Sequence, residues 1–127
     1  MSDLTNNNHW LLEVLYHANK TDIETYRVYK TYERYFTDNR DFLGVIENAN
    51  SKTFRFKPLT DLADDCLFSV TFFNRLIKRR QNRRGTPGIK FYSETGKNAF
   101  ASIGYPMIAE NWEFWTSYVN TNVTFNK

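Results

Sequence analysis

The stretch SVTFFNRLIKRRQNRR, residues Ser69 to Arg84, combines apolar and basic side chains at helical spacing. A helix advances by about 100° per residue, so positions three and four apart share a face. One face then gathers four apolar side chains, which are Phe72, Phe73, Leu76 and Ile77. The opposite face gathers four polar ones, which are Thr71, Asn74, Arg75 and Lys78. We therefore expect a helix over residues 69–80 that buries the first face and exposes the second.

The basic end of this stretch does not fit the same helix. Arg80, Arg83 and Arg84 would fall on the apolar side if the helix continued past residue 80. We therefore expect the helix to end between residues 80 and 82. The residues that follow, RRGTPG, would form a loop, so that residues 79–84 present a basic segment beside the helix.

Charge is divided unevenly between the two halves of the chain. Residues 1–65 hold 8 Lys or Arg and 11 Asp or Glu, whereas residues 66–127 hold 9 and 3. No acidic residue lies between Cys66 and Ser93. A concentrated positive patch attracts phosphate groups, anionic lipid surfaces or an acidic protein, and the charge pattern alone does not choose among them.

The segment LTDLADDCLFSVTFFNRLIKR, residues Leu59 to Arg79, resembles the helix-turn-helix of excisionase and MerR-like winged DNA-binding proteins. Ala63 matches the small buried position of the first helix, and Ser69 matches the N-cap of the second. The resemblance implies a turn near Leu67 and Phe68, followed by a recognition helix. The chain departs from the family pattern at Leu67, where glycine is usual, and the match covers about half of the chain.

The resemblance also implies an α+β fold, mostly helical, with a small β-hairpin wing. The wing would consist of a loop over residues 85–87, a strand over 88–93, a turn over 94–97 and a second strand within NAFASI. A helix over residues 106–120 would close the fold, because Pro106 suits a first helical position. Its apolar stripe has helical spacing and is expected to pack on the core or to form a dimer face: Ile108, Trp112, Trp115 and Val119.

The N-terminal part, residues 1–57, is expected to contribute a pair of helices over residues 9–18 and 22–36 and a short strand over 53–57. A chain of 127 residues with 41% hydrophobic positions is long enough for one core and too short for two full domains. We therefore expect a single domain over residues 1–127, with the helix-turn-helix, wing and closing helix in residues 58–127.

The resemblance implies binding to double-stranded DNA with helix 69–80 in the major groove, as a transcription regulator or an excisionase-like accessory factor. Four residues are expected to contact bases: Thr71, Asn74, Arg75 and Lys78. Five are expected to contact phosphates: Arg79, Arg83, Arg84, Lys90 and Lys97. The alternative is a non-enzymatic interaction protein of a phage or mobile element, whose basic face binds an acidic protein or RNA.

Patterns typical of enzymes and metal sites are not found in the sequence. His9 and His17 lie eight residues apart and are not expected to form a metal site, and Cys66 has no histidine nearby in the sequence and is expected to be buried. Neither a GKS/T loop nor a GxGxxG motif occurs. No apolar window could span a membrane, and the N-terminus lacks a secretory pattern. We expect a cytoplasmic protein without catalytic activity, cofactor, metal or membrane partner, and a homodimer is one candidate for its assembly.

Overall fold

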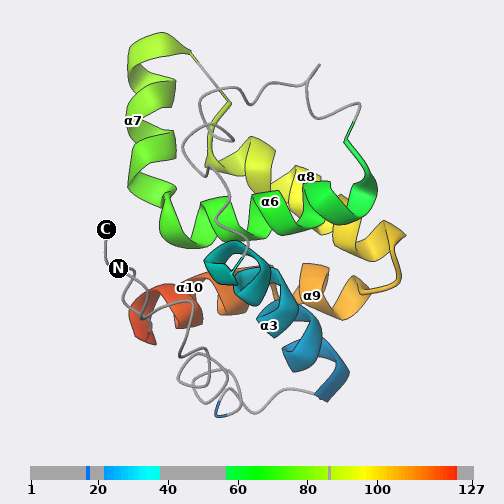
Figure 1. The fold of residues 1–127 in the computed structure, drawn as a ribbon. Helices are drawn as coiled ribbons and strands as arrows, with labels where there is room; N and C mark the ends of the chain where they lie inside the picture. Colours follow the sequence, from blue (N-terminus) through cyan, green and yellow to red (C-terminus); the bar gives the residue numbers. More distant parts are fainter. Residues whose placement is uncertain (1–16, 18–21, 38–56, 86, 123–127) are drawn as a thin grey trace.

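The computed structural model describes residues 17, 22–37, 57–85 and 87–122, and the regular structure in these ranges is entirely helical (Figure 1). The helices are α3 (Asp22–Thr37), α6 (Leu59–Phe72), α7 (Asn74–Arg84), α8 (Ile89–Ser102), α9 (Pro106–Glu110) and α10 (Trp112–Asn122). Because the described residues contain no strand, the expected α+β fold with a β-hairpin wing is wrong.

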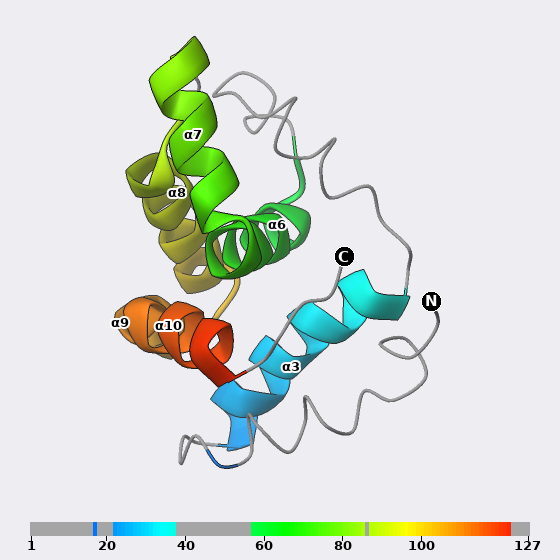
Figure 2. The same cartoon turned by 90° about the vertical axis from the view of Figure 1, so that its left-hand side faces the viewer.

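Helix α6 lies at the centre of these helices (Figures 1 and 2). Helix α8 runs beside it, while α3 and α10 contact it from other directions. Every residue from Leu62 to Thr71 is buried, and no Gly or Pro interrupts the helix. The turn expected near Leu67 and Phe68 is therefore absent. Ser69, expected as an N-cap, is a buried residue inside α6.

Residues 89–102 form helix α8, where a strand, a turn and a second strand were expected. The buried residues of α8 recur at the spacing of one helical face: Tyr92, Gly96, Ala99 and Phe100. Gly96 permits a close approach, because a Cβ atom there would lie 2.8 Å from Cys66 Cβ and would overlap the ring of Trp112. The segment that resembled a wing is thus the main partner of α6 in the core.

The C-terminal segment is helical as expected, but it is divided. Pro106 stands in the first turn of α9, and α10 begins after an interruption at Asn111. The predicted apolar stripe is confirmed as core, since all four of its members are buried: Ile108, Trp112, Trp115 and Val119. One hydrophobic cluster joins these residues to those of α3, α6 and α8.

Helix α3 confirms the helix expected over residues 22–36. It buries Val28 and Tyr32 against the common core, and Tyr32 lies edge-on to Phe72 with ring centroids 5.5 Å apart. The helix expected over residues 9–18 lies outside the described residues, except for His17, as does the strand expected over 53–57, except for Lys57. Within the described ranges, no helix is long and apolar enough to cross a membrane.

Candidate nucleic-acid interface

Helix α7 rises from the end of α6 at one side of the molecule and forms an arm there (Figure 1). The chain changes direction at Phe73, which separates α6 from α7 and has φ −118° and ψ 26°. Phe73 remains buried, and its N–H donates to the carbonyl of Ser69 at 2.8 Å. The buried end of α6 therefore anchors the arm, while the sequence beyond it, which is too basic to bury, leaves the core.

The inner face of α7 holds it against the body of the protein. Ile77 is buried, and Leu76 is half-buried against the core cluster. The side-chain amide of Gln81 occupies the space that a Cβ atom would need at Gly88, just before α8. Of the four residues expected to form an apolar face, Phe73 and Ile77 are buried, whereas Phe72 and Leu76 are only partly buried.

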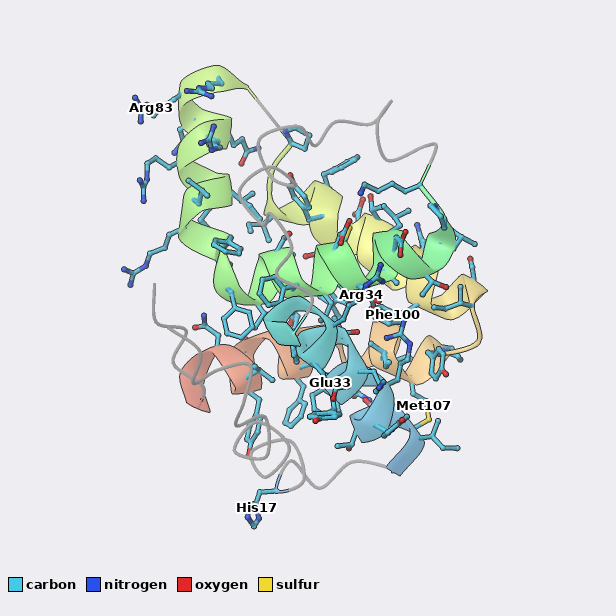
Figure 3. All side chains as sticks on the ribbon, in the orientation of Figure 1. His17, Glu33, Arg34, Arg83, Phe100 and Met107 are labelled. Atoms are coloured by element: carbon cyan, nitrogen blue, oxygen red, sulfur yellow. The ribbon has the colours of Figure 1, made fainter. Side chains whose placement is uncertain are left out.

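The outer face of α7 carries a row of basic side chains. We call this row the basic stripe; it consists of Arg75, Lys78, Arg79 and Arg83. All four are exposed, and a step of about 100° per residue places them within an arc of about 140°. Arg83 points away from the rest of the molecule at the outer end of the arm (Figure 3). None of the four forms an ion pair with an acidic residue in the described part of the chain.

Helix α7 continues to Arg84, so the basic loop expected over residues 79–84 is wrong. Gly85 ends the helix with φ +69°, and its N–H donates to the carbonyl of Gln81 at 3.0 Å. Glycine favours this left-handed conformation because it has no Cβ atom. The conflict expected on the apolar side is avoided because the arm leaves the core, which keeps Arg84 exposed and Arg80 only half-buried.

The residues expected to contact bases are not all on the surface. Asn74, Arg75 and Lys78 lie at the start of α7 with half-buried or exposed side chains. Thr71 is fully buried in α6, where its hydroxyl donates to the carbonyl of Leu67 at 2.7 Å and lies 2.8 Å from the hydroxyl of Tyr32. Thr71 is therefore not beside the basic stripe, contrary to expectation.

The residues expected to contact phosphates divide between two helices. Arg79, Arg83 and Arg84 are exposed on α7. Lys90 is exposed and Lys97 is half-buried on α8, so neither belongs to the basic stripe.

Negative charge near the start of α6 is neutralised inside the protein. Asp64 is buried and pairs with Arg27 at 2.9 Å and with Arg34 at 2.8 Å. Arg34 also pairs with Asp61 at 2.6 Å, and in Figure 3 it lies between α3 and α6. Thr31 donates a further hydrogen bond to Asp64 at 2.7 Å. These ion pairs hold α3 against α6. Because the two carboxylates are paired with α3, they do not neutralise the positive charge of α7.

Two further buried carboxylates serve the structure. Asp65 accepts from Lys57 at 2.9 Å, and burial raises the pKa of its carboxyl to about 7, although the charge of Arg34 opposes the shift. Glu24 accepts from the indole N–H of Trp115 at 2.5 Å and from the amide of Asn111 at 2.9 Å. Both carboxylates are engaged with neighbouring helices or segments rather than exposed to a substrate.

A groove runs between the base of α7 and α10. Its larger part, about 520 Å³, is lined by Phe72, Phe73, Asn74, Arg75, Leu76, Arg79 and Asn120. An adjoining hollow of about 200 Å³ shares three of these residues, Asn74, Arg75 and Asn120. We call the two together the α7–α10 groove. Sequence reasoning did not single out Asn120, because only the packing of α10 beside the end of α6 brings it to Asn74.

Catalytic chemistry finds no support in the described helices. Cys66 is buried as expected, and burial raises the pKa of its thiol, which disfavours a reactive thiolate. No group of three or more metal-ligating side chains occurs in the part of the chain that the structure describes. A comparison of the chain with protein-family models, curated proteins and solved structures finds no match in any of the three.

Proposed function

We propose that this protein is a non-enzymatic DNA-binding protein that inserts α7 into the major groove of double-stranded DNA. The observation that carries the proposal is the basic stripe on an arm that stands away from the core. Helix α7 has 11 residues, six of them Arg or Lys and none acidic. An α-helix of this length is about 16 Å long and fits a major groove that is about 12 Å wide.

The two ends of the arm suit different parts of a duplex. Asn74, Arg75 and Lys78 lie near its base, and amide and guanidinium groups can pair with the edges of adenine and guanine. Arg79, Arg83 and Arg84 lie farther along the arm, where their charges suit backbone phosphates. Reading of bases by the first group would make the protein sequence-specific, as a transcription regulator or accessory factor requires.

DNA suits this surface better than an acidic protein does. The exposed arc between Asn74 and Arg83 contains only polar and charged side chains, with Asn82 among the basic stripe. Protein interfaces usually surround an apolar or aromatic centre from which charges are depleted, whereas the apolar side chains near this arc lie at its edge, in the α7–α10 groove. Phosphate binding requires only a regular row of cations, which the arc supplies.

Selection from randomised duplex DNA, followed by titration of binding against salt, tests the proposal. Five exposed cations on α7 predict that log K falls with log salt with a slope of about −4.5 when all contact phosphates. Arg83→Ala should reduce that slope by about 0.9 for every sequence. Arg75→Ala should remove the preference for the selected sequence, weakening its binding by about 1–3 kcal/mol.

The matched control is Lys30→Ala, which removes the same charge from the exposed face of α3. It should leave both the salt slope and the sequence preference unchanged. The proposal is wrong if no sequence is enriched, or if Lys30→Ala and Arg83→Ala weaken binding equally. Binding to an acidic protein but to no duplex would favour the alternative of an interaction protein.

A further inference from the structure

The α7–α10 groove has an apolar floor. Phe72, Phe73 and Leu76 line its larger part, and Phe72 and Leu76 are only partly buried. The Phe72 ring is held in place from within, because its centroid lies 4.9 Å from that of Phe68 and 5.5 Å from that of Tyr32. The groove thus offers a fixed aromatic ring, and such a ring suits stacking with a planar ligand.

The walls of the groove are cationic and amide-bearing. Arg75 and Arg79 are exposed and are not ion-paired with any described acidic residue. Asn120 donates from Nδ2 to the carbonyl of Thr71 at 2.7 Å, which fixes its amide and leaves Oδ1 as an acceptor. The described residues that line the groove include no Asp or Glu. A ligand that combines a planar ring, hydrogen-bonding edges and negative charge fits these walls.

We propose that the α7–α10 groove binds one nucleobase together with its phosphate, supplied either by an unpaired nucleotide of the bound DNA or by a free mononucleotide. The volume of about 520 Å³ lies within the range of small-ligand sites. A base pair inside a duplex cannot enter the groove, whereas an unpaired base can stack on Phe72 while Arg79 binds its phosphate. This inference rests on the proposed DNA binding, because the groove lies beside the basic stripe and shares Arg75 and Arg79 with it.

Fluorescence anisotropy with two duplexes tests the inference, one blunt and one with a single unpaired nucleotide at its end. The full-length protein should bind the second about tenfold more tightly, since stacking of one base contributes about 1–3 kcal/mol. Phe72→Leu should abolish this difference and leave the affinity for the blunt duplex unchanged. Phe72→Tyr, which keeps the ring, should preserve the difference, and circular dichroism should show that both variants fold.

Lys78→Ala is the matched control, because Lys78 belongs to the basic stripe but does not line the groove. It should weaken both duplexes equally and preserve their difference. A third titration, with adenosine monophosphate or thymidine monophosphate alone, separates the two sources of the nucleotide. Saturable binding that Phe72→Leu abolishes would identify a free mononucleotide, whereas a preference for the unpaired end without such binding would identify a nucleotide of the DNA.

Failure of this inference differs from failure of the proposed function. If folded protein binds the two duplexes equally and neither monophosphate binds, the groove proposal is wrong, while DNA binding by the basic stripe stands. If no duplex binds but a monophosphate binds in a manner that requires Phe72, DNA binding is wrong and the groove proposal holds for free nucleotides. If neither duplex nor monophosphate binds, both are wrong.

Discussion

Replacement of Gly96 by alanine should destabilise the protein, although alanine is the better residue for a helix. The added methyl group would overlap the ring of Trp112, which is 2% exposed, and would lie 2.8 Å from Cys66 Cβ on α6. Neither neighbour is the free end of a flexible side chain, so α8 must move away from α6. Extra methyl groups in packed cores typically cost about 1–3 kcal/mol.

The expected net change combines this cost with helix propensity. Gly to Ala within a helix contributes about 1 kcal/mol in favour of the variant. Because Gly96 meets two rigid neighbours, we take an overlap cost of about 3 kcal/mol, which leaves a loss of about 2 kcal/mol in the free energy of unfolding. At about 4 °C per kcal/mol for a chain of this size, Tm should fall by about 8 °C.

Urea unfolding followed by circular dichroism measures the change. Asn98→Ala, at an exposed position of the same helix, controls for propensity and should stabilise by a few tenths of a kcal/mol. Trp112→Phe replaces the ring that the new methyl group meets by a smaller one. The double variant should therefore lose about 1 kcal/mol less free energy of unfolding than the two single variants lose in sum. If residue 96 instead lay in the exposed turn of a wing, Gly96→Ala would be neutral or stabilising, and that result would refute the packing of α8 on α6.

Three further changes probe the core and the arm. Burial raises the pKa of Asp65 from its ordinary value of 3.8 to about 7 in the folded protein, so the folded state holds an extra proton between about pH 4 and 7. This proton makes the free energy of unfolding decrease as pH rises through this window. Urea titrations at several pH values should show this decrease in the natural protein and should show that Asp65→Asn removes it. Tyr32→Phe removes the buried hydroxyl that donates to Thr71 and should lower the free energy of unfolding in urea by about 1 kcal/mol, whereas Tyr26→Phe, at an exposed position, should change it by less than about 0.5 kcal/mol. Gly85→Ala forces a side chain into φ +69° and should cost about 1–2 kcal/mol, so an unchanged Tm would argue against the left-handed end of α7.

Amphipathic elements could be predicted from the sequence because one side of each faces solvent. Helix α3 was expected over residues 22–36, and Val28 and Tyr32, four residues apart, form its buried face; the spacing of Trp112 and Trp115 located the core face of α10. Helix α6 could not be read in this way, because it is buried on every side over residues 62–71. Its buried Asp64 and Asp65 are explained only by partners on α3 and at Lys57, which local sequence does not reveal.

Glycine misled the interpretation of residues 85–102. Gly96 resembled a turn residue between two strands, but it serves the close approach of two helices. Gly85 was assigned to a loop, but it ends α7 in the αL conformation. Glycine is common directly after the last residue of a helix, so its position was the sequence signal that α7 extends through Arg84. Local sequence gives the same residue type for a turn, a helix end and a helix contact, and only tertiary packing distinguishes them.

The polar face expected over residues 69–80 was predicted only partly correctly. The reason is that the helical wheel assumed one straight axis over these residues. The change of direction at Phe73 divides that segment, so Thr71 follows the phase of α6 and is buried, while Asn74, Arg75 and Lys78 follow α7. Asn120 comes from a helix distant in sequence, and no local pattern could place it beside Asn74. The candidate DNA-contacting residues were therefore accessible to sequence reasoning, whereas the groove beside them was not.

The separation of charge in the folded chain links its stability to its proposed function. Arg27, Arg34 and Lys57 neutralise the carboxylates of α6, and this cluster holds α3 in place. The basic residues of α7 take no part in this cluster. Helix α7 is held to the body of the protein by the buried side chain of Ile77 and by the packing of Gln81 over Gly88. Positive charges gathered on one short helix repel one another, so the arm keeps them at a cost that its apolar contacts must offset. A row of cations retained at such a cost is understandable if an anionic partner neutralises it, and a duplex supplies phosphates at a regular spacing along the length of the arm.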